Sequence, residues 1–184
     1  MNLFSPTPYP DVNEILNILH SNVKKILNDQ FLGMYLYGSL ANGDFDKHSD
    51  IDVLIVTKEE ISAGTFSALQ QFHKRINLID SLWATQLEVS YIPQASLRRF
   101  DPINKLHPHM DRGNDEVLHV MSHESDWIVQ RHILRERGVV IEGPDLPSLI
   151  DPVSREDLRR AVASVLPLWI QPILKNPSQI HKRG

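Results

Sequence analysis

Proline is absent between Pro10 and Pro93, and this gap restricts the fold more than any other feature of the sequence. Proline lacks a backbone donor and interrupts helices and central strands, so residues 11–92 can hold long, uninterrupted elements. Nine prolines from Pro93 onward divide the second half of the chain into shorter pieces. The distribution predicts two domains, residues 1–105 and residues 106–184.

Helical and strand patterns alternate along the chain. We expect helices at 11–27, 66–79 and 123–138, strands at 31–38, 51–58 and 87–92, and a further helix that begins at Ser154. Asp11 with Glu14, and Ser154 with Asp157, have the spacing of helix-capping pairs. Pro167 is expected to end or kink the last helix. The alternation predicts an α/β or α+β fold, a sheet flanked by helices and followed by a helical segment.

The composition excludes several classes of protein. The 184 residues are 41% hydrophobic and carry a net charge of -4, with lysine and arginine scattered, so we expect no nucleic-acid partner. The chain has no cysteine for disulfides or thiolate metal sites. It has no apolar run of membrane-spanning length, and three prolines interrupt its first ten residues, so we expect a cytoplasmic protein without a membrane partner.

Two aspartates open the strand at 51–58. Asp50 and Asp52 are two residues apart and therefore point to the same side of a strand, where their carboxylates repel each other unless a cation lies between them. Mg²⁺ is bound by such oxygen ligands and leaves room for substrate phosphates. The pair Gly38-Ser39, at the end of the preceding strand, lets backbone amides approach an anion. The segment predicts a site for a metal ion and a nucleotide triphosphate.

This order of motifs resembles a known family. Gly38-Ser39 at the end of one strand, ten intervening residues and Asp-x-Asp on the next strand resemble the signature of the nucleotidyltransferase superfamily with the DNA polymerase β-like fold. The segments ATQLEVSYI, DWIVQRHILRERGVVIEGPDLPSLIDPVSREDL and LPLW resemble the aminoglycoside adenylyltransferases that modify streptomycin and spectinomycin. The resemblance implies a polymerase β-like sheet flanked by helices, followed by a shortened helical domain.

The resemblance also implies roles for the residues around the motif. Gly38 and Ser39 would bind the phosphates of ATP, and Ser49 would lie beside the metal site. Asp50 and Asp52 would bind two Mg²⁺ ions, one activating the attacking hydroxyl and one holding the triphosphate.

Two later acidic residues complete the implied site. Glu88 would deprotonate the acceptor hydroxyl, and its alternative is an outward-facing charge on a half-exposed strand. Asp126, at the start of the helix at 123–138, would face the nucleotide.

The expected function is metal-dependent transfer of AMP from ATP to a hydroxyl of a small, aminoglycoside-like acceptor. The alternatives are a protein adenylylating enzyme of the minimal nucleotidyltransferase antitoxin type and a catalytically weak nucleotide-binding remnant. The adenylyltransferases continue through several more helices, and the linker INKLHPHMDRGNDEV lacks their tryptophan, so we expect poor activity on streptomycin. An apolar stripe on the last helix predicts a homodimer; it comprises Leu166, Leu168, Trp169 and Ile173.

Histidines and arginines in the second half allow further sites. His119 and His123 could bind a metal ion if their segment were helical, but the neighbouring valines and leucine indicate a strand. Arg131, Arg135 and Arg137 could approach a triphosphate, and a solvated helix face is the alternative that we favour.

Overall fold

Six strands form one mixed sheet in the computed structural model, which describes residues 5–46, 48–113 and 116–175. The strands are β1 (Phe31–Leu36), β2 (Ile51–Thr57), β3 (Leu87–Pro93), β4 (Leu106–Met110), β5 (His119–Ser122) and β6 (Val139–Glu142). Their order in the sheet is β5-β4-β3-β2-β1-β6. Strands β2 and β3 are parallel, and the other neighbours are antiparallel. The expected combination of a sheet with flanking helices is confirmed.

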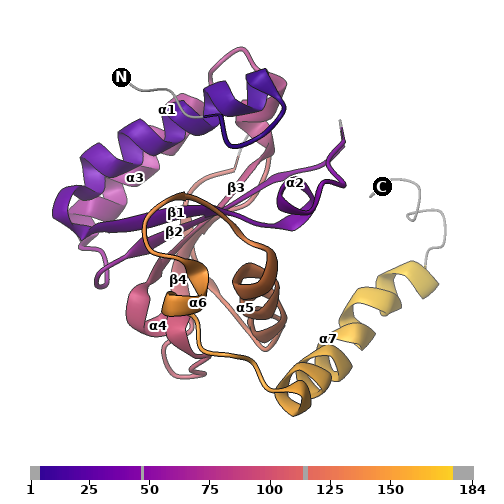
Figure 1. Cartoon of the computed structure of the whole chain (residues 1–184). Helices are drawn as coiled ribbons and strands as arrows, with labels where there is room; N and C mark the ends of the chain where they lie inside the picture. Colours follow the sequence, from indigo (N-terminus) through magenta and orange to yellow (C-terminus); the bar gives the residue numbers. More distant parts are fainter. Residues whose placement is uncertain (1–4, 47, 114–115, 176–184) are drawn as a thin grey trace.

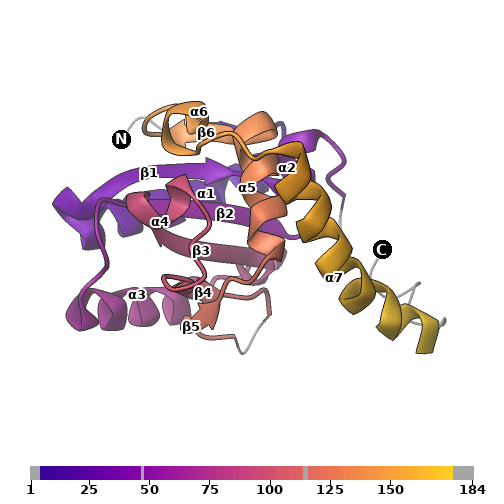
Figure 2. The same cartoon turned by 90° about the horizontal axis from the view of Figure 1, so that it is seen from below.

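Helices cover both faces of this sheet (Figure 1). Helices α1 (Pro10–Leu27) and α3 (Ala63–Ile76) cover one face, and α4 (Gln94–Arg98), α5 (Asp126–Arg137) and α6 (Leu146–Leu149) cover the other. Two short 3-10 helices, η1 (Asn28–Gln30) and η2 (Leu82–Gln86), precede β1 and β3. Figure 2, seen from below, shows α5 crossing in front of the strands.

Strand β2 is apolar at five of its seven positions because it is buried on both faces. Ile51, Val53 and Ile55 belong to the core beneath α1 and α3, whereas Leu54 and Val56 belong to the core beneath α5. Burial of each such side chain contributes roughly 1.5 to 3 kcal/mol relative to an exposed position. The buried strand therefore holds its first residues, including the aspartate at position 52, in a fixed place.

The start of α1 differs from the expected capping pair. The helix begins with Pro10 at its first position, the N-cap residue is Tyr9, and no side chain caps it. Proline suits this position because its missing N–H would have no partner in the first turn of a helix. Asp11 instead lies in the first turn, so its predicted capping role is wrong.

The last helix, α7 (Arg155–Lys175), has the predicted cap but a different end. The Asp157 backbone N–H donates to Ser154 Oγ at 3.0 Å, and Ser154 Oγ donates to the Asp157 carboxylate at 2.6 Å. Pro167 does not end the helix, because α7 continues to Lys175, and the alternative expectation of a kink at Pro167 stays a prediction. A proline removes one helical hydrogen bond, and the turns on both sides of Pro167 stay helical.

The predicted domain boundary falls within the sheet. Strands β4, β5 and β6 lie beyond residue 105, and β6 pairs with β1 in the same sheet. The division into residues 1–105 and 106–184 stays a prediction. Among the described helices, none combines the length and apolar character needed to cross a membrane.

Candidate active site

Three carboxylates meet at the start of the parallel strand pair. Asp52 on β2 is the register partner of Glu88 on β3, and Asp50 directly precedes β2. One ligand oxygen from each of the three lies within 4.8 Å of the other two. The structure therefore brings together the three residues that the sequence singled out as catalytic, while their roles stay predictions.

Gly38 allows Asp52 to occupy this place. Its backbone has a φ of +66°, and a Cβ atom on it would lie 1.8 Å from Asp52 Oδ2. The N–H of the preceding residue, Tyr37, donates to the Asp52 carbonyl at 3.2 Å, which keeps the two segments in contact. Glycine is required here for its positive φ and for this close approach.

Ser39, which follows Gly38 in the chain, has a hydroxyl group that no described residue uses. It lies on α2 (Gly38–Asn42), and its Oγ atom is buried without a hydrogen-bond partner among the described residues. A buried hydroxyl without a partner is unfavourable by about 1 to 3 kcal/mol, so this atom fits a site that a ligand completes. Because α2 has five residues, its dipole adds little, and the predicted phosphate binding depends on the Ser39 hydroxyl and the local amides.

The electrostatics of the cluster favour a cation. Burial, followed by repulsion from Asp50 and Glu88, raises the pKa of Asp52 to about 8. Burial, followed by the charges of Asp50 and Asp111, raises the pKa of Glu88 to about 7. A divalent cation would relieve this repulsion, and oxygen ligands are those that Mg²⁺ prefers. The donor set therefore fits Mg²⁺.

Arg112 is a member of the site that sequence reasoning missed. It follows β4, and its Nη1 atom lies 3.5 Å from Asp50 Oδ2 and donates to the His48 carbonyl at 3.3 Å. Its positive charge opposes the rise in the pKa of both Asp52 and Glu88. No local sequence motif marks it, because its place depends on the pairing of β4 with β3.

Sequence reasoning also missed a set of polar side chains that connects the buried Ser90 and His109 with Asp111 and Glu88. Ser90 Oγ lies 2.9 Å from His109 Nδ1, and His109 Nε2 lies 3.4 Å from Asp111 Oδ1 and 4.0 Å from Glu88 Oε1. Burial lowers the pKa of His109, so its ring is neutral near pH 7. Glu88 and Ser90 are two residues apart on one strand, and His109 and Asp111 are two residues apart on and after the next, so the members of each pair point to the same face. Knowledge that β3 pairs with β4 would therefore have placed all four on one face of the sheet.

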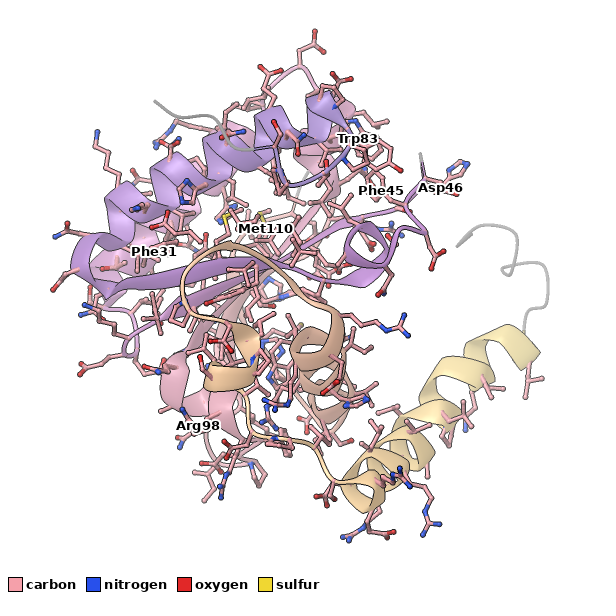
Figure 3. All side chains as sticks on the ribbon, in the orientation of Figure 1. Phe31, Phe45, Asp46, Trp83, Arg98 and Met110 are labelled. Carbon is pink, nitrogen blue, oxygen red and sulfur yellow. The ribbon has the colours of Figure 1, made fainter. Side chains whose placement is uncertain are left out.

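Ser49 and Asp126 lie in less direct positions. Ser49 Oγ donates to Asp46 Oδ1 at 3.2 Å and accepts from the Asp46 N–H at 3.0 Å, which shapes the loop before β2. Figure 3 places Phe45 and Asp46 on this loop near Trp83, and the Phe45 and Trp83 rings are 5.0 Å apart. Asp126 begins α5, which contacts α2. Their roles at the nucleotide stay predictions.

The predicted strand at His119 is confirmed, whereas the preferred interpretation of the arginines on α5 is partly wrong. His119 opens β5, as its neighbours predicted, and no histidine belongs to a candidate metal group within the described residues. Arg131 is buried, with its guanidinium donating to the Leu97 and Arg98 carbonyls. The preference for a solvated face is wrong for Arg131, since it joins α5 to the end of α4.

Comparison with known proteins gives a consistent set of relatives. The family described as nucleotidyltransferase domain matches residues 15–111, more than half of the chain. A spectinomycin 9-adenylyltransferase of Campylobacter jejuni is 27% identical over 162 residues, which cover 85% of this chain and 61% of the relative. An aminoglycoside (3'') (9) adenylyltransferase of Klebsiella pneumoniae is 24% identical over 168 residues, which cover 88% of this chain and 63% of the relative.

The fold has a counterpart among solved structures. A spectinomycin adenyltransferase from Enterococcus faecialis, solved with ATP and spectinomycin, matches with a TM-score of 0.66 and 20% identity, over 83% of this chain and 64% of that chain. The chain spans about three fifths of the length of the curated relatives that it matches. The matched family region contains Gly38, Ser39 and the three clustered carboxylates. The chain belongs to the nucleotidyltransferase domain family.

Proposed function

We propose that this protein is a metal-dependent nucleotidyltransferase that moves AMP from ATP to a hydroxyl group of a small acceptor. The observation that carries the proposal is the cluster of Asp50, Asp52 and Glu88 beside Gly38 and Ser39. Burial and repulsion from neighbouring carboxylates raise the pKa of Asp52 and of Glu88, and the buried Ser39 hydroxyl has no partner among the described residues. Such an arrangement suits a divalent cation and a phosphate group together.

Each residue has a defined task in this reaction. Asp50 and Asp52 would bind the metal, for which we propose two Mg²⁺ ions, and Ser39 would donate to a phosphate oxygen. Bound Mg²⁺ supplies positive charge to the triphosphate and lowers the pKa of an attacking hydroxyl. Ser49 and Asp126 are proposed to shape the nucleotide side of the site, from the loop before β2 and from the start of α5.

Glu88 is proposed as the general base. Its pKa of about 7 lies in the range in which a carboxylate can accept a proton near neutral pH. The acceptor oxygen forms a bond to the α-phosphorus while the bond from that phosphorus to the β-phosphate oxygen breaks. The hydroxyl proton moves to Glu88, and pyrophosphate leaves with the bonding electrons.

The acceptor is proposed to be a small, cationic compound with hydroxyl groups. Relatives named for spectinomycin and aminoglycoside adenylylation support this class. We expect poor turnover of streptomycin, because a polycationic drug needs large aromatic groups around it, and the segment 105–113 near Glu88 has no phenylalanine, tyrosine or tryptophan. A protein hydroxyl acceptor and a binding-only protein are the alternatives.

Mass spectrometry separates these functions. The protein is incubated with Mg-ATP and either spectinomycin, streptomycin or a cell extract, and the intact masses of acceptors are compared with those from the Asp50→Asn/Asp52→Asn variant. An AMP adduct on a small molecule supports the proposal. An adduct found on a protein alone, or ATP binding without any adduct, would replace it with one of the two alternatives.

Self-association through α7 is a separate proposal. Four apolar residues on its outer surface are exposed at four-residue spacing: Val162, Leu166, Ile170 and Leu174. Of the expected stripe, Leu166 is 44% exposed, and the side chains of Leu168, Trp169 and Ile173 lie outside the described ones. An exposed apolar face of this kind favours a homodimer.

A further inference from the structure

Arg112 pairs with Asp50, one of the carboxylates that would also bind a metal ion. Its Nη1 atom lies 3.5 Å from Asp50 Oδ2, at the edge of the three-carboxylate cluster. Within the described part of the chain, no other lysine or arginine forms an ion pair with Asp50, Asp52 or Glu88. A single positive charge therefore lies next to three carboxyl groups. Without a cation, the cluster must either carry excess negative charge or bind protons.

The contacts of Arg112 are those of a side chain that can move. Its side chain is 42% exposed, its ion pair involves a single nitrogen atom, and its carbonyl contact with His48 is long at 3.3 Å. An exposed pair of this kind contributes about 0 to 1 kcal/mol, so releasing it is inexpensive.

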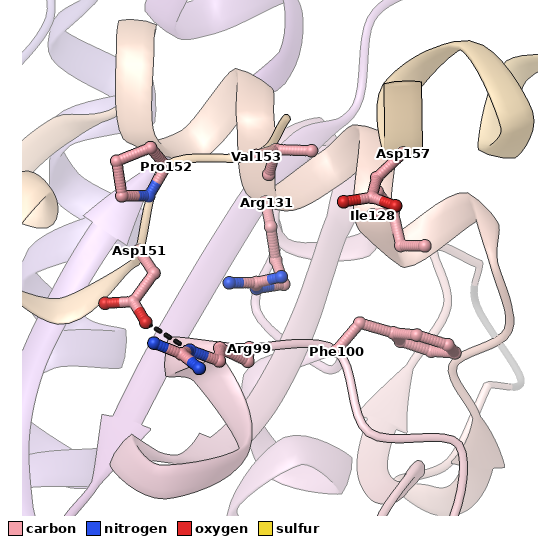
Figure 4. A pocket seen from close by; sticks show the side chains of 8 residues that line it. All are labelled: Arg99, Phe100, Ile128, Arg131, Asp151, Pro152, Val153 and Asp157. Atoms are coloured by element: carbon pink, nitrogen blue, oxygen red, sulfur yellow. Dashed lines mark hydrogen bonds and ion pairs between the residues drawn. The ribbon is translucent and has the colours of Figure 1, made fainter. Parts of the chain in front are cut away.

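Arg131 shows the contrast within the same chain. It is 4% exposed, and its Nε atom donates to the Leu97 carbonyl at 2.7 Å. Figure 4 shows it among the side chains that line a cavity of about 730 Å³, whose lining includes none of the three clustered carboxylates. Arg131 is held as a structural connection between α5 and α4, whereas Arg112 is held mainly by charge.

We propose that Arg112 is an exchangeable counter-ion, which pairs with Asp50 in the metal-free protein and transfers to the triphosphate of ATP once a divalent cation binds the carboxylates. The nucleotide half of this inference rests on the proposed function. A guanidinium suits both partners, because its N–H groups match carboxylate and phosphate oxygens in the same planar geometry. Its position beside Asp50 places it next to the phosphates that would share the metal.

The proposal predicts effects of opposite sign for one substitution. Arg112→Gln removes a positive charge that competes with the metal, so the affinity for Mn²⁺ alone is expected to rise about threefold to tenfold. The same variant loses a phosphate partner, so its affinity for ATP at saturating Mg²⁺ is expected to fall about tenfold or more. Arg112→Lys keeps the charge, so Mn²⁺ affinity stays near that of the wild type and ATP binding weakens less.

Two titrations test this. Free Mn²⁺ is measured by electron paramagnetic resonance without nucleotide, and ATP binding by calorimetry with Mg²⁺. Arg159→Gln is the matched control, because Arg159 is 79% exposed on α7 and its loss changes the net charge equally. Melting temperatures verify that all variants are folded.

The outcomes separate the inference from the proposed function. If Arg112→Gln binds both Mn²⁺ and ATP more weakly than the wild type, the inference is overturned and Arg112 has a structural role. If both affinities are unchanged, the inference is also overturned, because Arg112 then takes no part in the site. If Arg159→Gln raises the Mn²⁺ affinity as much as Arg112→Gln does, the rise comes from the change in net charge alone. That result would overturn the proposed counter-ion role of Arg112. If the wild type fails to bind ATP, the triphosphate half fails with the proposed function, while the Mn²⁺ titration still decides the counter-ion half.

Discussion

Asp52 on β2 and Glu88 on β3 are register partners across the parallel strand pair at the centre of the sheet. A shift of either strand by one residue would turn its carboxylate to the opposite face. The apolar residues that follow on both strands, among them Val53 and Val89, are fully buried and fix this register. The sheet thus holds two repelling carboxyls in place before any ligand binds.

Loss of Asp52 is expected to stabilise the metal-free protein in a pH-dependent way. A carboxyl whose pKa rises from 3.8 to about 8 on folding binds more protons in the folded state. The wild type therefore loses stability as the pH rises between these values. Asp52→Asn removes this penalty, so its melting temperature in EDTA should exceed that of the wild type by a margin that grows toward about pH 8.

Thermal unfolding across this pH range provides the measurement, with the exposed Asp80→Asn as a control for net charge. Saturating Mg²⁺ is expected to narrow the difference by stabilising only the wild type. A variant that melts far below the wild type in EDTA at every pH would show that Asp52 has a structural role instead.

Replacement of Glu88 separates proton transfer from binding. Glu88→Gln keeps the shape and removes the base, so Mg-ATP affinity is expected to change little while transfer slows by roughly 10² to 10⁴. Calorimetry and single-turnover transfer to the acceptor identified by mass spectrometry measure the two effects. Collapse of ATP binding would make Glu88 a metal ligand, and unchanged transfer would make it a bystander.

A side chain at position 38 is expected to disrupt the site through Asp52. Gly38→Ala places a Cβ 1.8 Å from Asp52 Oδ2 and forces alanine into a φ of +66°, so we expect a loss of at least about 1 kcal/mol in the free energy of unfolding. In an Asp52→Ala background most of the overlap disappears, and the cost is expected to be smaller.

Urea unfolding of the four proteins in this double-mutant cycle gives the coupling energy. Equal costs of Gly38→Ala in both backgrounds would show that backbone conformation alone, rather than contact with Asp52, requires the glycine.

The exposed face of α7 gives a prediction about assembly. Replacing Leu166 and Leu174 with glutamate is expected to shift a concentration-dependent dimer to monomer, because their side chains are 44% and 72% exposed and apolar. Sedimentation over a range of concentrations measures this, with Leu78→Glu/Leu82→Glu as a control at exposed leucines outside α7. A monomeric wild type would contradict the proposed homodimer.

The part of the site that follows local pattern was open to sequence analysis. The apolar residues 53–56 mark a strand, and Asp50 and Asp52 lie at its start. Gly38 lies at the end of the preceding strand pattern, at 31–38. Arg112 and His109 were not foreseeable in this way. Their places depend on which strand β4 joins, and that pairing is set by tertiary packing rather than by local sequence.

The errors at the helix ends have a similar cause. Several end arrangements are close in energy, so a Ser or Asp near a helix start is a weak indicator. The sequence offered Asp11 as a cap for α1, whereas the chain uses Pro10 at the first position.

Calorimetric titration with ATP, in EDTA and in saturating Mg²⁺, tests most directly whether the carboxylate cluster is a metal-dependent nucleotide site. The wild type is expected to bind ATP at least about tenfold more tightly with Mg²⁺, because the cation neutralises carboxylates that otherwise repel the triphosphate. Asp50→Asn/Asp52→Asn is expected to lose this gain while staying folded. Equal affinities of the wild type in EDTA and in Mg²⁺ would contradict the account.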